Sequence, residues 1–202
     1  MQADSSLSNE NNFKVPIVYA RKMKTMKMTN VIPYLFLVML GFSSCSSIPK
    51  GVVAVKPFNK EKYLGKWYEI ARIDFKYERN LNNTTAEYSL NDNGSIIVDN
   101  RGFNYLKGKN EQAIGKAKFI GDDNIAMLKV SFFGPFYAGY NVIALDEDYK
   151  YALVSGDNFK YLWILSRETT IPDEIKKKYL QIAENFGFNT SDLIWVDHDE
   201  NK

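Results

Sequence analysis

Short stretches rich in β-branched and aromatic residues follow one another at intervals of about ten residues between residues 66 and 166. Residues that favour tight turns separate them, and Asn91-Asp92-Asn93-Gly94 is the clearest of these turns. This spacing is typical of antiparallel sandwiches and barrels. The predicted strands are Lys66–Asp74, Thr84–Leu90, Ser95–Asn104, Gln112–Ile120, Ala126–Phe132, Gly139–Leu145, Tyr151–Ser155 and Tyr161–Ser166.

Eight consecutive strands joined by hairpin turns favour an all-β, up-and-down antiparallel barrel. Closing such a sheet removes its edges and leaves room for one small ligand. After the last strand the period changes to that of a helix over residues 172–186, with Pro172 near its start and Gly187 as the expected C-cap. This amphipathic helix is predicted to pack outside the barrel, and Leu193–Val196 is predicted to add a short strand.

The first 44 residues differ from the rest of the chain. They carry five basic and two acidic side chains, a net charge of +3, whereas the whole chain has +2, which leaves −1 for residues 45–202. The apolar run Val31–Phe42 is too short to span a bilayer, which takes about twenty residues. We therefore expect a signal peptide with an N-terminal extension over residues 1–44, a lipidated linker over 45–60, and one barrel domain with its helix over 61–202.

The apolar run ends in Phe42-Ser43-Ser44-Cys45-Ser46, which resembles a bacterial lipoprotein signal. The resemblance implies that Cys45 becomes the lipidated first residue of the mature protein, anchored in a membrane by its acyl chains. Ser46 after the cysteine resembles the signals that are sorted to the outer membrane. The alternative is a plain secretory signal with a leftover cysteine.

Composition excludes several classes of function. A net charge of +2 does not call for a nucleic-acid partner. One cysteine excludes a disulfide within the chain, and one histidine excludes a metal site that needs two imidazoles, so no metal and no cofactor are expected. No nucleophile, base and acid are grouped in the predicted barrel, so the chain is not expected to be an enzyme. Haem ligation by Tyr88 or Tyr140 is kept as a minor alternative.

Three segments carry a family resemblance. They are the start of the first strand (Gly65 to Ala71), the sixth turn (Leu145 to Tyr149) and the end of the eighth strand (Leu162 to Arg167). Together with Lys129–Leu145 they are similar to the lipocalins, and above all to the outer-membrane lipoproteins of bacteria, which are akin to apolipoprotein D. The resemblance covers about Pro57 to Val196. The residues that match the lipocalin signature are Gly65, Trp67, Asp146, Tyr149 and Arg167.

The resemblance implies a calyx that Trp67 closes at one end, with Arg167 stacked on its ring in a structural role. It also implies a lipid-anchored outer-membrane protein that binds fatty acids or (lyso)phospholipids, for their storage or transport in membrane maintenance. The membrane itself, reached through the anchor, and a second copy of the chain are the further partners to be expected.

Alternation along the strands gives the expected lining of the calyx. It mixes small and aromatic residues, which favours an apolar cavity, although large side chains filling the gaps would make a solid core instead. Glu69 is the one carboxylate expected to point inward. The predicted ligand pocket comprises Ala71, Ile73, Ala86, Tyr88, Val98, Ala117, Leu128, Val130, Phe132, Tyr140, Val142, Tyr161 and Trp163.

The loops at the opposite end from Trp67 are rich in aromatic residues with basic residues nearby, which suits an amphiphile with its head at the rim. The same aromatic mouth suits a protein partner, an assembly role or a homodimer contact. These aromatic residues are Phe75, Tyr77, Phe103, Tyr105, Phe133, Phe136, Tyr137 and Phe159.

Overall fold

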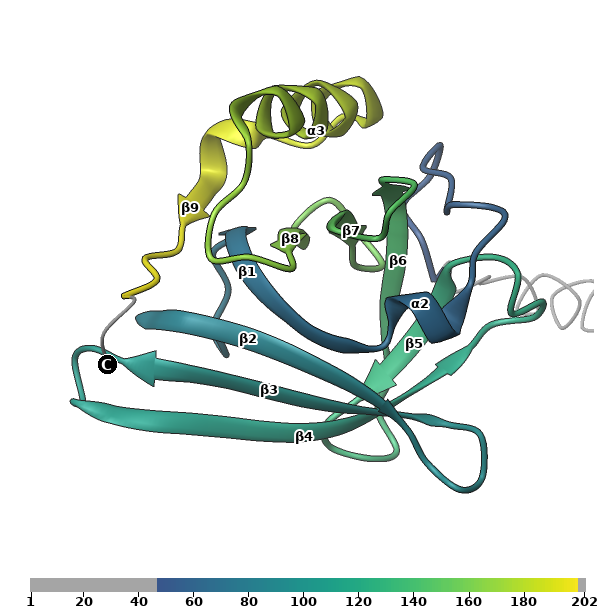
Figure 1. Cartoon of the computed structure of the whole chain (residues 1–202), viewed down its shortest axis with the longest axis horizontal. Coiled ribbons are helices and arrows are strands. Elements are labelled where there is room, and N and C mark those ends of the chain that lie inside the picture. Colours follow the sequence, from purple (N-terminus) through teal and green to yellow (C-terminus); the bar gives the residue numbers. More distant parts are fainter. Residues whose placement is uncertain (1–46, 200–202) are drawn as a thin grey trace, which may run out of the picture. The chain divides into compact units, whose positions relative to one another are not determined.

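A computed structural model describes residues 47–199 as a closed barrel with a helix beside it (Figure 1). The strands are β1 (Gly65–Ile73), β2 (Leu81–Leu90), β3 (Ile96–Asn104), β4 (Lys109–Phe119), β5 (Met127–Ser131), β6 (Ala138–Leu145), β7 (Tyr151–Ser155) and β8 (Leu162–Ser166). Each pairs antiparallel with the next, and β1 pairs with both β2 and β8. The predicted eight-stranded up-and-down barrel is therefore confirmed.

Local turn chemistry fixes several strand ends. Between β2 and β3, Asn91 both donates to and accepts from the backbone of the turn, and Gly94 has a φ of 78° that suits glycine. Two strands are longer than predicted, because the β2–β3 and β3–β4 ladders continue into the loops: β2 begins at Leu81 and β4 at Lys109. We call the end with the β1–β2, β3–β4, β5–β6 and β7–β8 loops the open end, and the other the closed end.

The predicted external helix is present as α3 (Asp173–Phe186), which Figure 1 shows outside the barrel. Its buried residues Tyr179 and Ala183 pack in an apolar cluster with residues of β7 and β8. The Tyr179 hydroxyl donates a 2.8 Å hydrogen bond to the Tyr151 carbonyl, and Gly187 closes the helix in the left-handed conformation. Within residues 47–199 no helix has the length and apolar character needed to cross a membrane.

After α3 the chain forms a short 3-10 helix, η1 (Thr190–Asp192), and then β9 (Leu193–Trp195). β9 pairs with the second half of β1, where β1 no longer pairs with β2. The Val196 amide donates to the Ile70 carbonyl at 3.0 Å and so extends this pairing. The C-terminal segment thereby completes the wall between β1 and β2 toward the open end.

Two apolar clusters share the sheet, one inside the barrel and one between its outer face and α3. Strict alternation would place Trp67, Ala71 and Ile73 on one face of β1, but the β1–β8 register shifts between Glu69 and Ala71. Trp67 lies in the inner cluster, whereas Ala71 and Ile73 lie in the outer one. The expectation that Ala71 and Ile73 line the pocket is thus corrected, because a β-bulge reverses the faces of the strand.

Residues 47–59, expected to be part of a linker, run along the barrel wall. Ser47 lies beside the first residues of β6, and its carbonyl accepts a 2.8 Å hydrogen bond from the Asn141 side chain. The Val55 amide donates to the Val142 carbonyl at 2.8 Å, and Phe58 is buried in the inner cluster. The segment therefore descends from the open end to the closed end, where the short helix α2 (Lys60–Tyr63) follows.

Candidate functional site

Trp67 and Arg167 form the floor of the barrel. The Trp67 side chain is fully buried, and its indole N–H donates a 2.8 Å hydrogen bond to the Tyr63 carbonyl. The central carbon of the Arg167 guanidinium lies 3.8 Å from the centre of the Trp67 ring, which is the expected cation–π contact. Tyr63 in turn packs on Trp67, with their ring centres 4.9 Å apart. The floor is thus built from three adjoining flat groups, with the Tyr63 and Trp67 rings tilted by 35° to each other.

The same guanidinium also binds backbone carbonyls from three segments. Gly65, which has a φ of 91°, passes close to it, and a Cβ at this position would lie 3.5 Å from Arg167 Nη1. A guanidinium presents five donors in a fixed fork, so it can serve several acceptors at once. The carbonyls that accept from it are those of Lys62 (3.0 Å), Tyr63 (3.1 Å), Leu64 (2.9 Å), Lys66 (2.7 Å) and Tyr149 (3.2 Å).

The turn between β6 and β7 holds the other two signature residues. The Asp146 carboxylate accepts from the backbone amides of Asp148, Lys150 and Tyr151, at 3.1, 2.7 and 2.5 Å. Tyr149 has a φ of 60°, and its hydroxyl accepts a 2.8 Å hydrogen bond from the Asn59 amide. Both residues therefore order the closed end, and the Tyr149 ring also packs against the inner cluster beside Phe58.

A small apolar cavity lies above this floor. The centre of a water-sized sphere can occupy about 10 Å³ of it, which is room for about one water molecule. Six residues of the predicted pocket line it: Tyr88, Val98, Ala117, Leu128, Val130 and Tyr140. The remaining lining residues are Phe58, Lys60, Tyr63, Leu64 and Ile96. The interior is therefore apolar at this level, and the chain's own aromatic rings fill much of it.

Three tyrosine hydroxyls meet at the wall of the cavity. Tyr140 is central, with its hydroxyl oxygen 2.7 Å from that of Tyr63 and 2.8 Å from that of Tyr88. Burial raises the pKa of all three phenols, so they are neutral at physiological pH. Three hydroxyls that share two hydrogen bonds keep one O–H available to another acceptor. The deep part of the barrel thus offers weak, uncharged polarity in an apolar surrounding.

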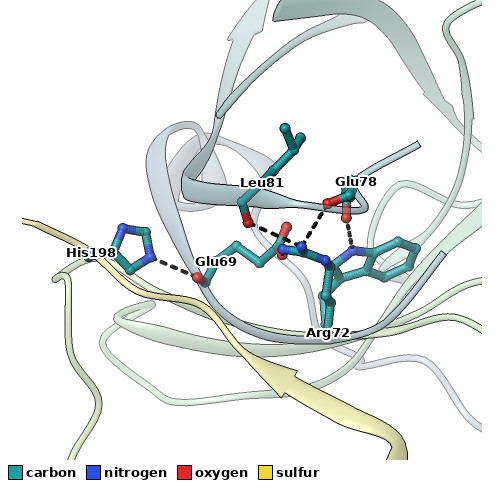
Figure 2. Close-up of polar contacts among 6 residues, drawn as sticks. Glu69, Arg72, Glu78, Leu81 and His198 are labelled. Carbon is teal, nitrogen blue, oxygen red and sulfur yellow. Dashed lines mark hydrogen bonds and ion pairs between the residues drawn. The ribbon is translucent and has the colours of Figure 1, made fainter. Parts of the chain in front are cut away.

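A charged network lies nearer the open end (Figure 2). The Arg72 guanidinium donates to the Glu69 carboxylate at 2.7 Å and to the carbonyls of Glu78 and Leu81 at 2.7 and 3.1 Å. The Trp163 indole donates to the Glu78 carboxylate at 3.0 Å. Burial raises the pKa of both glutamates, and the charge of Glu78 raises that of Glu69 further. The network joins the β1–β2 loop to β1 and β8.

This network contains the residues that sequence reasoning missed. Glu69 was expected to point inward, and it is buried as expected. Its partner Arg72 points to the same side only because of the bulge in β1, and Glu78 comes from a loop. No sequence pattern around Arg72 or Glu78 indicates that either residue belongs to the buried network. The backbone carbonyl of Glu69 accepts a 2.8 Å hydrogen bond from the ring nitrogen Nε2 of His198.

The other predicted pocket residues surround the cavity without lining it. Ala86, Phe132, Val142 and Trp163 belong to the inner cluster or pack against it. The Tyr161 ring stacks on Trp163 with 6.2 Å between ring centres, nearer the open end. Cys45, the predicted lipidation site, lies outside the described residues.

A closed antiparallel calyx, sealed by a stacked tryptophan and arginine and flanked by an external helix, is the architecture of proteins that bind small hydrophobic molecules. Comparison with known proteins narrows this class. Residues 58–198 match the family model described as "Lipocalin-like domain". The chain therefore belongs to the lipocalin family, whose members are generally ligand-binding proteins and not enzymes.

Relatives with close sequence similarity are lipoproteins. The chain is 51% identical over 176 residues to "Outer membrane lipoprotein Blc" of Citrobacter freundii, covering 86% of this chain and 97% of the relative. It is 54% identical over 155 residues to the protein of the same name from Escherichia coli K12, covering 76% and 88%. The expected location, lipid-anchored in the outer membrane, agrees with these relatives and is the location of this chain.

More distant proteins share the family or the fold. Apolipoprotein D of Rattus norvegicus is 38% identical over 125 residues, which cover 58% of this chain and 65% of that protein. The structure of insecticyanin from the tobacco hornworm Manduca sexta superimposes with a TM-score of 0.62 at 21% identity, covering 77% of this chain and 88% of the other. At that identity the likeness supports the barrel fold alone.

Replacement of the floor arginine should destabilise the barrel. In Arg167→Lys the charge is kept, but one ammonium cannot stack flat on Trp67 or reach all the carbonyls that Arg167 binds. We expect the free energy of unfolding to fall by about 2–3 kcal/mol, measured by urea denaturation. Arg101→Lys is the matched control, because Arg101 is exposed and bonds to Asp99. An equal effect of both substitutions would contradict a special role for the floor.

The buried glutamates should make stability depend on pH. Because the pKa of Glu69 is raised in the folded state, the folded protein binds more protons than the unfolded one above about pH 4.3. The free energy of unfolding should therefore fall as pH rises from there through the folded-state pKa, by up to about 1.4 kcal/mol per pH unit for one proton. Glu69→Gln mimics the protonated acid and should flatten this decline in urea denaturation.

Glu111→Gln is the control for this experiment. A hydrogen bond from Lys107 lowers the pKa of Glu111, so its contribution is lost only as pH falls. The control should keep the decline above about pH 4.3. If the free energy of unfolding of Glu69→Gln falls with pH as steeply as that of the unsubstituted protein, then Glu69 does not bind the proton that causes the decline.

Proposed function

We propose that this lipocalin binds fatty acids or (lyso)phospholipids by their acyl chains inside the barrel, as a store or carrier of lipid for maintenance of the outer membrane. It does so without catalysis. The observation that carries the proposal is the apolar cavity above a sealed floor, lined by Tyr88, Val98, Ala117 and Leu128. An acyl chain gains about 0.8 kcal/mol for each CH₂ group removed from water, so apolar lining alone supplies affinity.

Binding includes movement of side chains, because the cavity holds only about one water molecule as it stands. Phe132 and Trp163 are half-buried and lie between the cavity and the open end. The Phe132 ring rests over Gly115, where a Cβ would come within 2.8 Å of it. Rotation of such rings makes room for a chain next to Ala117 without displacing the backbone.

The two levels of the interior suit an amphiphile. An acyl chain in the deep, apolar part brings the polar part of the ligand to the level of Arg72, Glu69 and Glu78. Because the Arg72 guanidinium is already paired with the Glu69 carboxylate and the Glu78 carboxyl group is buried close by, this level favours the neutral groups of a lipid, such as an ester or a hydroxyl, over a buried anion. An anionic head then stays at the rim, in water.

A bulky residue in the cavity should prevent binding. Ala117 is 4% exposed and lines the cavity on β4, so Ala117→Trp would fill the space that the acyl chain needs. We expect at least about a tenfold loss of affinity for long-chain fatty acids and lysophospholipids, measured by displacement of a fluorescent fatty acid. Ile114→Trp is the control, since Ile114 lies on β4 but is 62% exposed on the outer face.

The outcome that contradicts the proposal is equally clear. Circular dichroism first establishes that both tryptophan variants are folded. Unchanged affinity in folded Ala117→Trp, or no uptake of any long-chain amphiphile by the unsubstituted protein, would refute acyl-chain binding at this cavity.

We infer that Cys45 carries the lipid anchor. It is the single cysteine of the chain, and it stands directly after the predicted signal. Cys45→Ala should release the protein from membranes, because no acyl chain can then be attached; the measurement is fractionation of cells in high salt. Ser44→Ala is the control, since it keeps both the cysteine and a small residue before it. A Cys45→Ala protein that still sediments with membranes would contradict the inference.

A further inference from the structure

Large apolar side chains are exposed to solvent at the open end of the barrel. Phe136 is 79% exposed, Phe133 70% and Tyr77 69%. Phe133 belongs to the β5–β6 loop and Tyr77 to the β1–β2 loop, yet their ring centres are 6.3 Å apart. A group of exposed aromatic side chains from separate loops is typical of a surface that binds a protein, a ligand or a membrane.

The two ends of the barrel differ sharply in composition. The closed-end loops (residues 91–95, 120–126 and 146–150) contain six acidic side chains, one lysine and one aromatic ring. The open-end loops (residues 74–80, 105–108, 132–137 and 156–161) contain three acidic side chains, four basic ones and nine aromatic rings. At the closed end Lys56 and Lys60 pair with Asp122 and Asp123, so the clearest difference between the two ends is their aromatic content. The open-end loops combine many aromatic rings with a small excess of basic groups, which suits an anionic phospholipid surface.

Lysines lie directly over the aromatic rings of this end. Lys76 Nζ is 5.7 Å from the centre of the Tyr77 ring. Lys118 and Lys129 lie 5.1 and 5.3 Å from the Tyr137 ring, on the outer wall next to the β5–β6 loop. Aromatic rings beside long cationic side chains suit the boundary of a bilayer, where the ring enters the headgroup layer and the ammonium reaches phosphate or water.

The N-terminal segment reaches the barrel at this same end. Ser47 lies against Gly139 at the start of β6, and Gly139 also adjoins Asp157 of the β7–β8 loop. Cys45 precedes Ser47 by two residues, which span at most about 7 Å even when fully extended. A lipid on Cys45 is therefore attached close to the open end, whatever path those two residues take.

We propose that the open end of the barrel lies against the surface of the membrane, with Tyr77, Phe133 and Phe136 in its headgroup layer. The occupant of the aromatic surface is thus a phospholipid bilayer. The inference uses the anchor at Cys45 from the proposed function and does not depend on which lipid the cavity holds. It goes beyond anchoring, because an anchor alone leaves the barrel free to turn in any direction.

The direct test uses the full-length lipidated protein in vesicles of phosphatidylethanolamine and phosphatidylglycerol in equal amounts. With Cys45 blocked by its lipid, Phe136→Cys supplies a single reactive thiol for a polarity-sensitive dye, and Glu147→Cys supplies the matched thiol at the closed end. We expect blue-shifted emission and quenching by nitroxide-labelled lipids for the dye at residue 136, and neither at residue 147.

A dye at residue 136 that stays in water, or a dye at residue 147 that is quenched as strongly, overturns the proposal. If the aromatic loops bind a protein partner or a second copy of this chain instead of lipid, the dye at residue 136 should also stay in water. The reason is that the vesicles contain no partner protein and hold this protein at low density. Circular dichroism of both labelled proteins shows that the barrel is intact.

A second measurement separates this surface from the cavity. In the double variant Phe133→Ser with Phe136→Ser, transfer of a fluorescent lysophospholipid from the vesicle into the barrel should slow by about tenfold, because the mouth loses its hold on the bilayer. Affinity for the same lipid in solution should be unchanged, because neither residue lines the cavity. An unchanged rate of lipid transfer in the double variant overturns the proposal. If the unsubstituted protein shows no affinity for the lipid in solution, that result contradicts only the proposed function.

Discussion

The guanidinium of Arg167 holds together segments that would otherwise meet only at their ends. It stacks on the Trp67 ring of β1. Its N–H groups donate to backbone carbonyls of α2, of β1 and of the β6–β7 turn. These carbonyls lie in the last turn of α2, at the start of β1 and in the β6–β7 turn. One side chain therefore both seals the barrel and satisfies the backbone at its base.

A sealed floor has consequences for the whole interior. The deep interior above the floor is lined by apolar side chains, and its polar groups are the hydroxyls of Tyr63, Tyr88 and Tyr140, which bond to one another. Polar and charged groups appear higher, where Arg72 bridges Glu69 and the β1–β2 loop. The barrel thus grades from apolar at the base to polar near the mouth, which is the profile of an amphiphile inserted tail first.

The sequence predicts the architecture well because strand period, turn residues and helix caps are local signals. The turn at Asn91 to Gly94, the strand Tyr151–Ser155 and the helix that ends at Gly187 are all present. The bulge after Glu69 has no such signal, because it arises from pairing with β8. For that reason Ala71 and Ile73 were assigned to the wrong face, and Arg72 was not recognised as an interior residue.

Volume is the second quantity that local patterns do not give. Small residues such as Ala86, Gly115 and Ala117 do face the interior, as alternation requires. Whether they leave space depends on the rotamers of distant rings, and here Phe132 lies over Gly115. The extent of the packed wall also depends on residues 47–59, whose apolar side chains Val52 and Phe58 bind to the barrel although their sequence reads as a linker.

The path of residues 47–59 along the barrel determines which end of the barrel is nearer to the N-terminal attachment point. The chain meets the barrel at Ser47 by the mouth and then descends to Phe58 at the floor, so the anchor proposed for Cys45 belongs to the end that carries the mouth. A lipid that left the bilayer at the far end would expose its acyl chain to water, at about 0.8 kcal/mol for each CH₂ group. With the mouth against the membrane, the chain passes from bilayer to barrel while most of it stays covered. An anchor at the mouth, as proposed, would therefore lower the barrier to exchange, whereas an anchor at the floor would only retain the protein.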